Sequence, residues 1–208
     1  MKSAVLLLSS GLDSAANLAL AQDHDFKVGL ALTVDYGQKG AVRELRHAAG
    51  LARHFGVAHE MFDLTGFSKA VGGKSALFGA GAVPTPSSLD DLAVTTKTAA
   101  AVWVPNRNGV LLSLAAAVAE SRGMQAVAVG FNAEEAVTFA DNTTDFMRAM
   151  TDALKFSTAN RVEVVSATAK LTKKQIVEKL AGLSFPFELL WSCYYGGGAH
   201  CRRCESCQ

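Results

Sequence analysis

Residues 4–14, AVLLLSSGLDS, decide the fold, because an apolar run here ends in a turn of small residues. Five consecutive aliphatic residues at 4–8 are typical of a strand buried on both faces of a sheet. The small residues 9–11 end this strand, and Asp13 or Ser14 can then cap a helix. The stretch therefore predicts a buried strand, a tight turn and a helix in direct succession.

The same alternation of strands and helices continues along the chain. Further strands are expected at 28–34, 58–64, 126–129 and 162–165, and helices at 13–22, 41–55, 109–122, 143–156 and 172–180. Alternating elements of this kind favour a parallel sheet with helices on both faces. We predict an α/β fold with a Rossmann-like parallel sheet, one nucleotide-binding domain over 1–185 and a small C-terminal segment over 186–208.

Regular patterning is lost between residues 66 and 99. This region holds five glycines, Pro84, Pro86 and the pair Ser87-Ser88. Long irregular segments in compact domains are usually functional or disordered. The sequence therefore predicts a long loop or a flexible insertion here.

The overall composition excludes several functional classes. The 208 residues are 50% hydrophobic and 19% charged, which is typical of one globular domain. A net charge of +1 provides no field to attract a polyanion, so we expect no nucleic-acid partner. The longest apolar stretch, around 111–119, is far shorter than the ~20 residues that cross a bilayer. No signal-peptide cleavage site follows the first residues, and we expect a cytoplasmic protein with no membrane partner.

The turn at 9–11 has the composition of an anion site. In a parallel sheet, ligands bind at the carboxyl ends of strands, where backbone N–H groups and a helix N-terminus stabilise negative charge. Ser9, Ser10 and Ser14 add hydroxyl donors. The turn lacks both the lysine of a Walker loop and the spaced glycines of a dinucleotide fingerprint. It can hold the pyrophosphate of a nucleotide, and an ordinary helix cap is the alternative.

Further polar residues are expected at the same edge of the sheet. Asp35 follows the second strand and can take Mg²⁺ or a ribose hydroxyl, while Lys39 can take a phosphate; an ordinary turn is the alternative. Arg107 opens a helix after Pro105, where its guanidinium can bind a phosphate or a carboxylate. Lys173 opens the last helix near a strand end, although a lysine in this position is usually just exposed.

The loop after the strand at 126–129 combines acids, amides and aromatic rings. This mixture is suited to a flat, hydrogen-bonding heterocycle, and a solvated loop is the alternative. The candidate residues are Phe131, Asn132, Glu134, Glu135, Phe139 and Asp141.

All four cysteines lie in the last sixteen residues, as Cys193, Cys201, Cys204 and Cys207. Two x2 spacings bring sulfur atoms close enough to share one ion, and four thiolates fit a closed tetrahedral zinc site. Such a site would fold the tail without taking part in chemistry. An iron–sulfur cluster and a redox disulfide pair are the alternatives, and His200 is expected to stay outside the site.

Together these segments resemble a known family. The turn is similar to the PP-loop motif, Ser-Gly-Gly-x-Asp-Ser, of enzymes that cleave ATP between its α and β phosphates. The other matching segments are VDYGQK at 34–39, VPNRN at 104–108, GFNAEE at 130–135, TFADN at 138–142 and SCY at 192–194. In this order, with the cysteine tail, they resemble the 7-cyano-7-deazaguanine synthase family of queuosine biosynthesis. Only 66–99 has no counterpart in the resemblance.

The resemblance implies a ligase that converts 7-carboxy-7-deazaguanine, ammonia and ATP into a nitrile through adenylated carboxylate and amide intermediates. It also implies Mg²⁺, structural zinc held by the four cysteines, and a homodimer. The implied catalytic residues are Asp13, Ser14, Arg107 and Lys173. The implied ATP-binding residues are Leu8, Ser9, Ser10, Gly11, Leu12, Asp13, Ser14, Ala15, Ala16, Asn17, Leu18, Asp35 and Lys39. The six residues of the loop that follows 126–129 are implied to bind the deazaguanine.

The chain departs from this family in two places. Ser10 stands where the motif has its first glycine; a positive φ there would strain a serine, and we expect a tolerated small residue. The relatives continue beyond the last cysteine, so we expect the natural chain to be longer.

Two other functions remain open. A PP-loop enzyme that modifies tRNA would need a basic surface and a catalytic cysteine outside a closed metal site, and no cysteine precedes Cys193. A nucleotide-binding relative without activity is the other alternative.

Overall fold

A computed structural model describes residues 1–89 and 91–208 of the chain. Its sheet has five parallel strands in the order β3-β2-β1-β4-β5. The strands are β1 (Lys2–Leu7), β2 (Phe26–Asp35), β3 (Ala58–Asp63), β4 (Ala126–Ala128) and β5 (Glu163–Val165). This strand order is that of a Rossmann-like sheet, and the predicted α/β class is confirmed.

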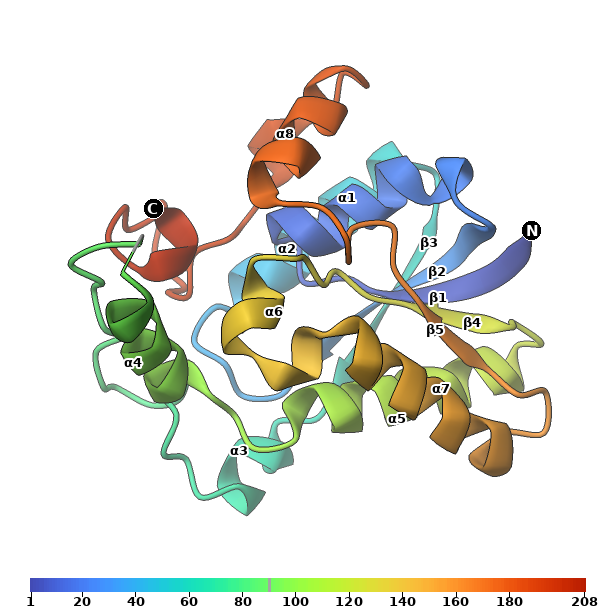
Figure 1. Cartoon of the computed structure of the whole chain (residues 1–208), viewed down its shortest axis with the longest axis horizontal. Helices are drawn as coiled ribbons and strands as arrows, with labels where there is room; N and C mark the ends of the chain where they lie inside the picture. Colours follow the sequence, from blue (N-terminus) through green and yellow to red (C-terminus); the bar gives the residue numbers. More distant parts are fainter. Residues whose placement is uncertain (90) are drawn as a thin grey trace.

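Helices cover both faces of the sheet (Figure 1). The helices α1 (Leu12–Leu20), α2 (Ala41–His54) and α8 (Lys173–Ala181) pack on one face, and α5 (Arg107–Ser121) and α7 (Thr144–Ser157) pack on the other. The alternation along β1 explains the two cores, since Ala4 and Leu6 join the first and Val5 joins the second. No helix within residues 1–89 and 91–208 has the length and apolar character to span a bilayer.

The region predicted to be irregular contains two helices, α3 (Gly66–Ala70) and α4 (Leu92–Val102). The Asp91 carboxylate caps α4 by accepting hydrogen bonds from the N–H groups of Ala93 and Val94. The prediction of a loop over 66–99 was therefore wrong for these two segments. Residue 90, which belongs to the same predicted insertion, lies outside the described residues.

The insertion and the cysteine tail share a third, smaller core. Its buried members are Tyr36, Leu77, Phe78, Val83, Val102, Val104, Trp191, Cys193 and Cys204. Figure 1 shows α4 beside the C-terminal tail, and the Thr98 hydroxyl donates to Glu205 Oε2 at 2.7 Å. The Tyr195 hydroxyl accepts from the Val83 N–H at 2.8 Å. The insertion is thus packed onto the tail at several points.

Five short helical segments complete the described part of the chain. They are α6 (Glu135–Thr138) and the 3₁₀ turns Ala21–Asp23, Ala140–Asn142, Phe187–Leu189 and Glu205–Cys207. Both α6 and the turn at Ala140–Asn142 lie in the loop that follows β4. This loop is more ordered than its mixed composition indicates.

Candidate functional site

A cavity of about 1020 Å³ opens at the carboxyl ends of β1, β2 and β4. Strand order reverses between β1 and β4, and α/β sheets bind ligands at such a point. The walls are formed by the turn after β1, the end of β2, the loop after β4, the insertion and the tail. The volume is at the upper end of single-ligand pockets, so it can hold a nucleotide together with a second molecule.

The turn after β1 is fixed by its own serines. The Ser14 hydroxyl accepts the Ser9 N–H at 3.2 Å and lies 3.1 Å from the Ser9 hydroxyl. The N–H of Leu8 donates to the Leu32 carbonyl at 2.9 Å, and the Thr33 hydroxyl donates to the Leu8 carbonyl at 2.7 Å. Leu8, Ser9, Gly11, Leu12, Asp13 and Ser14 all line the cavity, as an anion site requires.

Ser10 has a φ of +63°, in the left-handed region that favours glycine. Its side chain is fully buried, and its hydroxyl donates to the Ser9 carbonyl. The Ser10 carbonyl accepts the Trp191 N–H at 3.0 Å, which ties the turn to the tail. The positive φ that strains a serine is therefore present, contrary to the expectation of a tolerated small residue, and the local hydroxyl bond offsets part of the strain.

The loop after β4 touches the back of this turn. A Cβ atom at Gly130 would lie 2.3 Å from the Ser14 backbone nitrogen. Only glycine allows so close an approach between the two backbones.

Four residues of α1 that were predicted to bind ATP do not line the cavity, and neither does Ser10. Ala15, Ala16 and Leu18 pack into the core between α1 and the sheet. The Asn17 amide donates to the Asp13 carbonyl at 2.9 Å and accepts the Ala167 N–H at 2.8 Å. These residues hold the first turn of α1 in place.

Asp13 has an unusual carboxyl group. Its Oδ1 atom is buried and makes no hydrogen bond of normal geometry among the described residues, while the Asn132 side chain lies close enough to act against the rise in the pKa of Asp13. Burial raises the pKa of Asp13 to about 7, with a further rise from Glu135, and nearby Lys173 opposes both effects. A buried carboxyl group beside a lysine and two glutamates can change its charge when a cation or an anion enters the cavity.

Lys173 is brought next to this turn, as the sequence predicts. Its ammonium group lies 3.0 Å from Glu135 Oε1, and its backbone N–H donates to Glu134 Oε1 at 2.9 Å. Burial works to lower the pKa of Lys173, but the carboxylates of Glu135 and Asp13 outweigh it and raise the pKa. The lysine is therefore charged at neutral pH and oriented into the cavity's acidic side.

The acids of the loop after β4 have different positions. Both oxygens of Glu135 are engaged, since Oε2 accepts from the Asn142 amide at 3.1 Å while Oε1 pairs with Lys173. Asp141 lines the cavity; burial raises its pKa and Arg107 opposes the rise. Phe131 and Phe139 also line the cavity, whereas Asn132 is fully buried and holds the N–H groups of Glu134 and Glu135.

Arg107 reaches the cavity from the first turn of α5. Its guanidinium carbon lies 5.9 Å from the centre of the Tyr36 ring, and Nε donates to Asn108 Oδ1 at 3.1 Å. Burial alone would lower the pKa of Arg107, but its interactions with Tyr36 and Asp141 outweigh this effect, and the pKa is raised. A fixed guanidinium in a partly enclosed cavity is a suitable clamp for a carboxylate.

The structure does not bring Asp35 and Lys39 into the cavity. The Lys39 ammonium donates to the carbonyls of Ala76 and Phe78, so it holds the insertion in place. Asp35 Oδ1 accepts the Gly37 N–H at 2.9 Å in a local turn. Both residues lie at or just after the end of β2, as the sequence predicted, but their side chains bind nearby backbone groups and so do not face the cavity.

Sequence reasoning missed Glu44, which lies in the first turn of α2 and lines the cavity. Burial raises the pKa of Glu44 to about 7, while a hydrogen bond from Gln38 at 2.9 Å and the charge of Arg107 oppose the rise. It also missed Trp103, Trp191 and Tyr194 in the walls. Acidic residues are common in the first turn of a helix, so nothing in the sequence indicated that Glu44 lines the cavity.

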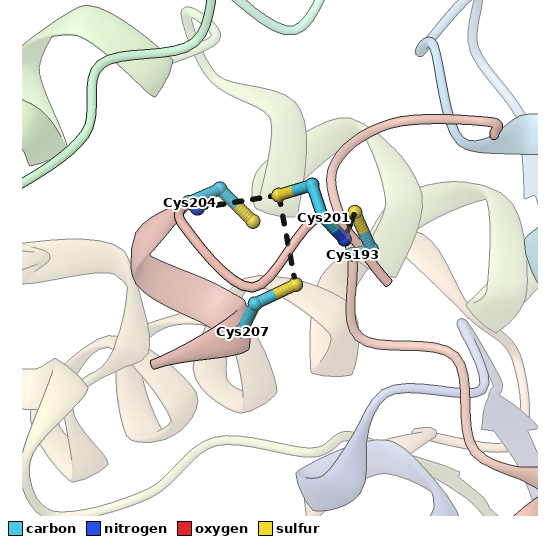
Figure 2. Close-up of side chains that lie close together, drawn as sticks. All are labelled: Cys193, Cys201, Cys204 and Cys207. Carbon is cyan, nitrogen blue, oxygen red and sulfur yellow. Dashed lines mark hydrogen bonds between the residues drawn. The ribbon is translucent and has the colours of Figure 1, made fainter. Parts of the chain in front are cut away.

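The four cysteines converge at the tail (Figure 2). All four sulfur atoms lie within 4.8 Å of one another, so they can bind a metal ion. The N–H groups of Tyr195 and Cys201 point at the Cys193 sulfur, each at 3.4 Å. Backbone donors of this kind stabilise thiolate charge, which fits the donor set of a closed zinc site. Cys207 also lines the cavity, so the segment that carries the four cysteines forms part of the cavity wall.

A family model described as "Queuosine biosynthesis protein QueC" matches residues 3–208. The chain belongs to the QueC family. Its relatives include a protein of Bdellovibrio bacteriovorus, 46% identical over 99% of this chain and 90% of the relative. Another, from Carboxydothermus hydrogenoformans, is 43% identical over the whole chain and 95% of the relative. Both are named 7-cyano-7-deazaguanine synthase.

A solved structure also shares the fold of this QueC-family chain. The NMN synthetase of Francisella tularensis superposes with a TM-score of 0.51 at 14% identity, over 97% of this chain and 70% of that one. At this identity the likeness concerns the architecture alone.

Proposed function

We propose that this QueC-family chain is a 7-cyano-7-deazaguanine synthase, an ATP-dependent ligase that converts a carboxylate and ammonia into a nitrile. The observation that carries the proposal is one cavity in which the turn after β1, Lys173 and Arg107 meet. The names of relatives that match nearly the full chain support the same reaction.

The turn after β1 is proposed to bind the pyrophosphate that leaves ATP. Its backbone N–H groups lie at the N-terminus of α1, and the hydroxyls of Ser9 and Ser14 face each other across it. Lys173 adds a charged donor beside the turn. Because these donors are already in place, they stabilise negative charge as it develops on the leaving group.

The carboxylate of Asp13, which lines the cavity beside this turn, is suited to a magnesium ion. When bound, Mg²⁺ would neutralise phosphate charge, and Asp13 would be held in its ionised form. This assignment replaces Asp35, whose side chain is engaged in a local turn.

Arg107 is proposed to orient the carboxylate of 7-carboxy-7-deazaguanine toward the α phosphate. A carboxylate oxygen attacks that phosphorus and pyrophosphate leaves; ammonia then displaces AMP to give an amide. A second ATP adenylates the amide oxygen, and loss of AMP and protons leaves the nitrile. No covalent attachment to a side chain is needed, so positioning and charge account for catalysis.

The tail is proposed to hold one structural zinc ion through Cys193, Cys201, Cys204 and Cys207. Four thiolates leave no open coordination position, so the metal would stabilise the tail. A cytoplasmic location and a homodimer complete the proposal on the strength of the family resemblance, and sedimentation at micromolar concentration tests the dimer.

Incubation of the purified protein with 7-carboxy-7-deazaguanine, ammonium, Mg²⁺ and ATP tests the reaction. We expect the nitrile by mass spectrometry, with two AMP and two pyrophosphate released per nitrile. A folded, metal-loaded protein that forms neither amide nor nitrile would contradict the proposal. Release of pyrophosphate without a nitrogen product would identify a different acyl-adenylating enzyme.

A further inference from the structure

The reaction proposed for this chain leaves one carboxyl group of the cavity wall, that of Glu44, without a role. Glu44 lies in the first turn of α2 and lines the cavity beside Tyr36 and Gln38. Desolvation by burial is the largest influence on its pKa, so the carboxyl group is largely withdrawn from bulk water. A carboxylate in such a place is stabilised when a cation binds to it.

One oxygen of Glu44 is held in place and the other is free. Gln38 Nε2 donates to Glu44 Oε2 at 2.9 Å, and this amide is itself oriented because its oxygen accepts the Tyr36 N–H at 2.9 Å. Glu44 Oε1 makes no hydrogen bond or ion pair within residues 1–89 and 91–208. It lies over the start of α2, where a Cβ atom at Gly40 would be 2.8 Å away. The carboxyl group is therefore fixed with one acceptor available to a ligand.

Glu44 and Arg107 influence each other without pairing. The charge of Arg107 acts to lower the pKa of Glu44, but among the described residues the two side chains form no ion pair. Arg107 instead contacts Asn108 and the face of Tyr36. Because Arg107 is proposed to hold the substrate carboxylate, a cation bound to Glu44 would lie beside that carboxylate.

The other groups around Glu44 favour a small monovalent cation. Asp35 adds to the rise that burial causes in the pKa of Glu44, but its Oδ1 accepts the Gly37 N–H in a local turn. Burial also raises the pKa of Tyr36; Arg107 opposes this rise and Glu44 adds to it. Mg²⁺ requires a near-octahedral set of oxygen ligands, and a single free carboxylate oxygen is a poor start for one. Ammonium needs only hydrogen-bond acceptors, and it is the cation that the proposed reaction consumes.

We propose that Glu44 binds ammonium and takes a proton from it, so that ammonia is released beside the activated carboxyl group. This inference rests on the proposed function for the identity of the reaction. One proton moves from ammonium to Glu44 Oε1, and the nitrogen lone pair forms a bond to the carbonyl carbon. The bond from that carbon to the AMP oxygen breaks, and AMP leaves with the electron pair. The nitrogen loses a second proton to water as the amide forms, and Glu44 returns its own proton to water.

The environment of Glu44 suits this proton transfer. Ammonia is almost entirely protonated near neutral pH, so a nucleophile has to be generated at the site. Burial raises the pKa of Glu44 to about 7, which makes its carboxylate a stronger base than that of an exposed glutamate. Its negative charge also raises the local concentration of ammonium.

Two nucleophiles distinguish this role from a structural one. Ammonium has to lose a proton before it attacks, whereas hydroxylamine is a weaker base, is mainly uncharged near neutral pH and attacks directly. Glu44→Gln should lower kcat/KM for ammonium by about 100-fold or more, as removal of a general base does. With hydroxylamine, which gives a hydroxamate, kcat/KM should stay within about threefold of the wild type. Mass spectrometry measures both products.

Exchange of pyrophosphate with ATP reports the first adenylation alone. It is measured with 7-carboxy-7-deazaguanine and without a nucleophile, and Glu44→Gln should keep the wild-type rate within about threefold. That result also establishes that the variant is folded. Glu188→Gln, at an exposed glutamate that does not line the cavity, is the matched control and should resemble the wild type with both nucleophiles.

Wild-type kinetics with ammonium in Glu44→Gln would overturn the inference. Equal losses with ammonium and hydroxylamine would give Glu44 a structural role and would overturn it too. Loss of pyrophosphate exchange in Glu44→Gln alone would place ATP or the heterocyclic acid at Glu44 in place of ammonium. Absence of exchange in the wild type would contradict the proposed function, and the inference with it.

Discussion

Replacement of Asp13 by asparagine is expected to stabilise the ligand-free protein above neutral pH. The carboxyl group has a pKa of about 7 in the folded protein, against 3.8 as its ordinary value. Between these two values the folded state keeps a proton that the unfolded state releases. Stability of the wild type therefore falls as pH rises from about 4 to 7, and this loss is complete above pH 7. Asparagine cannot ionise, so the variant escapes this penalty.

The size of the effect follows from the shift in pKa. Three pKa units correspond to about 4 kcal/mol, which is an upper limit because the carboxyl group faces a cavity that water enters. We expect the variant to be more stable than the wild type by about 1–3 kcal/mol at pH 8, and the two proteins to be nearly equal at pH 4. Glu44 titrates in the same direction in both proteins, so the difference between them isolates Asp13.

Urea denaturation at several pH values between 4 and 8.5 measures this difference. Asp23→Asn, at an exposed position after α1, is the matched control and should follow the wild type. Asp13→Asn should also abolish nitrile formation, because it removes the carboxylate charge proposed to bind Mg²⁺. Parallel stability curves for wild type and D13N would refute the assigned burial of this carboxylate, and full turnover would refute its role.

Three further predictions concern the turn, the lysine and the tail. Ser10→Val should lower the free energy of unfolding, measured by urea denaturation, by at least about 2 kcal/mol, because a β-branched residue is strained at φ +63°. Ser10→Gly should stay within about 1 kcal/mol of the wild type. Equal stabilities of the two variants would contradict this prediction. Lys173→Met should lower kcat/KM by about 100-fold or more, because the charge that stabilises the leaving pyrophosphate is lost. Lys179→Met, on the exposed side of α8, is the control and should leave kcat/KM unchanged. A decrease of tenfold or less in Lys173→Met would exclude this role for Lys173. Elemental analysis of Cys204→Ser should show the loss of one zinc ion per chain. The melting temperature of this variant should also fall, because Cys204 is fully buried in the core shared by the insertion and the tail. An unchanged metal content would rule out the four-cysteine site.

The central sheet could be predicted because its signals are local. The apolar run at 4–8 and the small residues after it specify a buried strand and a turn by themselves, and β1 with α1 follows within one or two residues of the expected bounds. The convergence of Cys201, Cys204 and Cys207 was also predictable, since two x2 spacings leave their sulfur atoms little freedom to separate, whereas Cys193 reaches them only through the fold of the tail.

The remaining parts of the site depend on contacts between distant segments. The chain around Val83 is ordered by the Tyr195 hydroxyl, more than a hundred residues away, and no local pattern announces such a bond. The sequence predicted Lys39 as a phosphate ligand, but its ammonium group donates to two carbonyl oxygens of the insertion, which no local pattern indicates. Glu44 becomes a cavity residue only because Gln38 and Arg107 are placed around it.

The cysteine tail links the two ends of the cavity. The N–H of Trp191 is bonded to the Ser10 carbonyl beneath the proposed pyrophosphate turn, and Glu205 is bonded to Thr98 on α4, which carries Trp103 at its end. A metal ion bound by the cysteines would therefore stabilise both the turn after β1 and the position of α4. A closed metal site in the wall of a cavity would then have a structural role, since the tail joins the turn after β1 to the insertion.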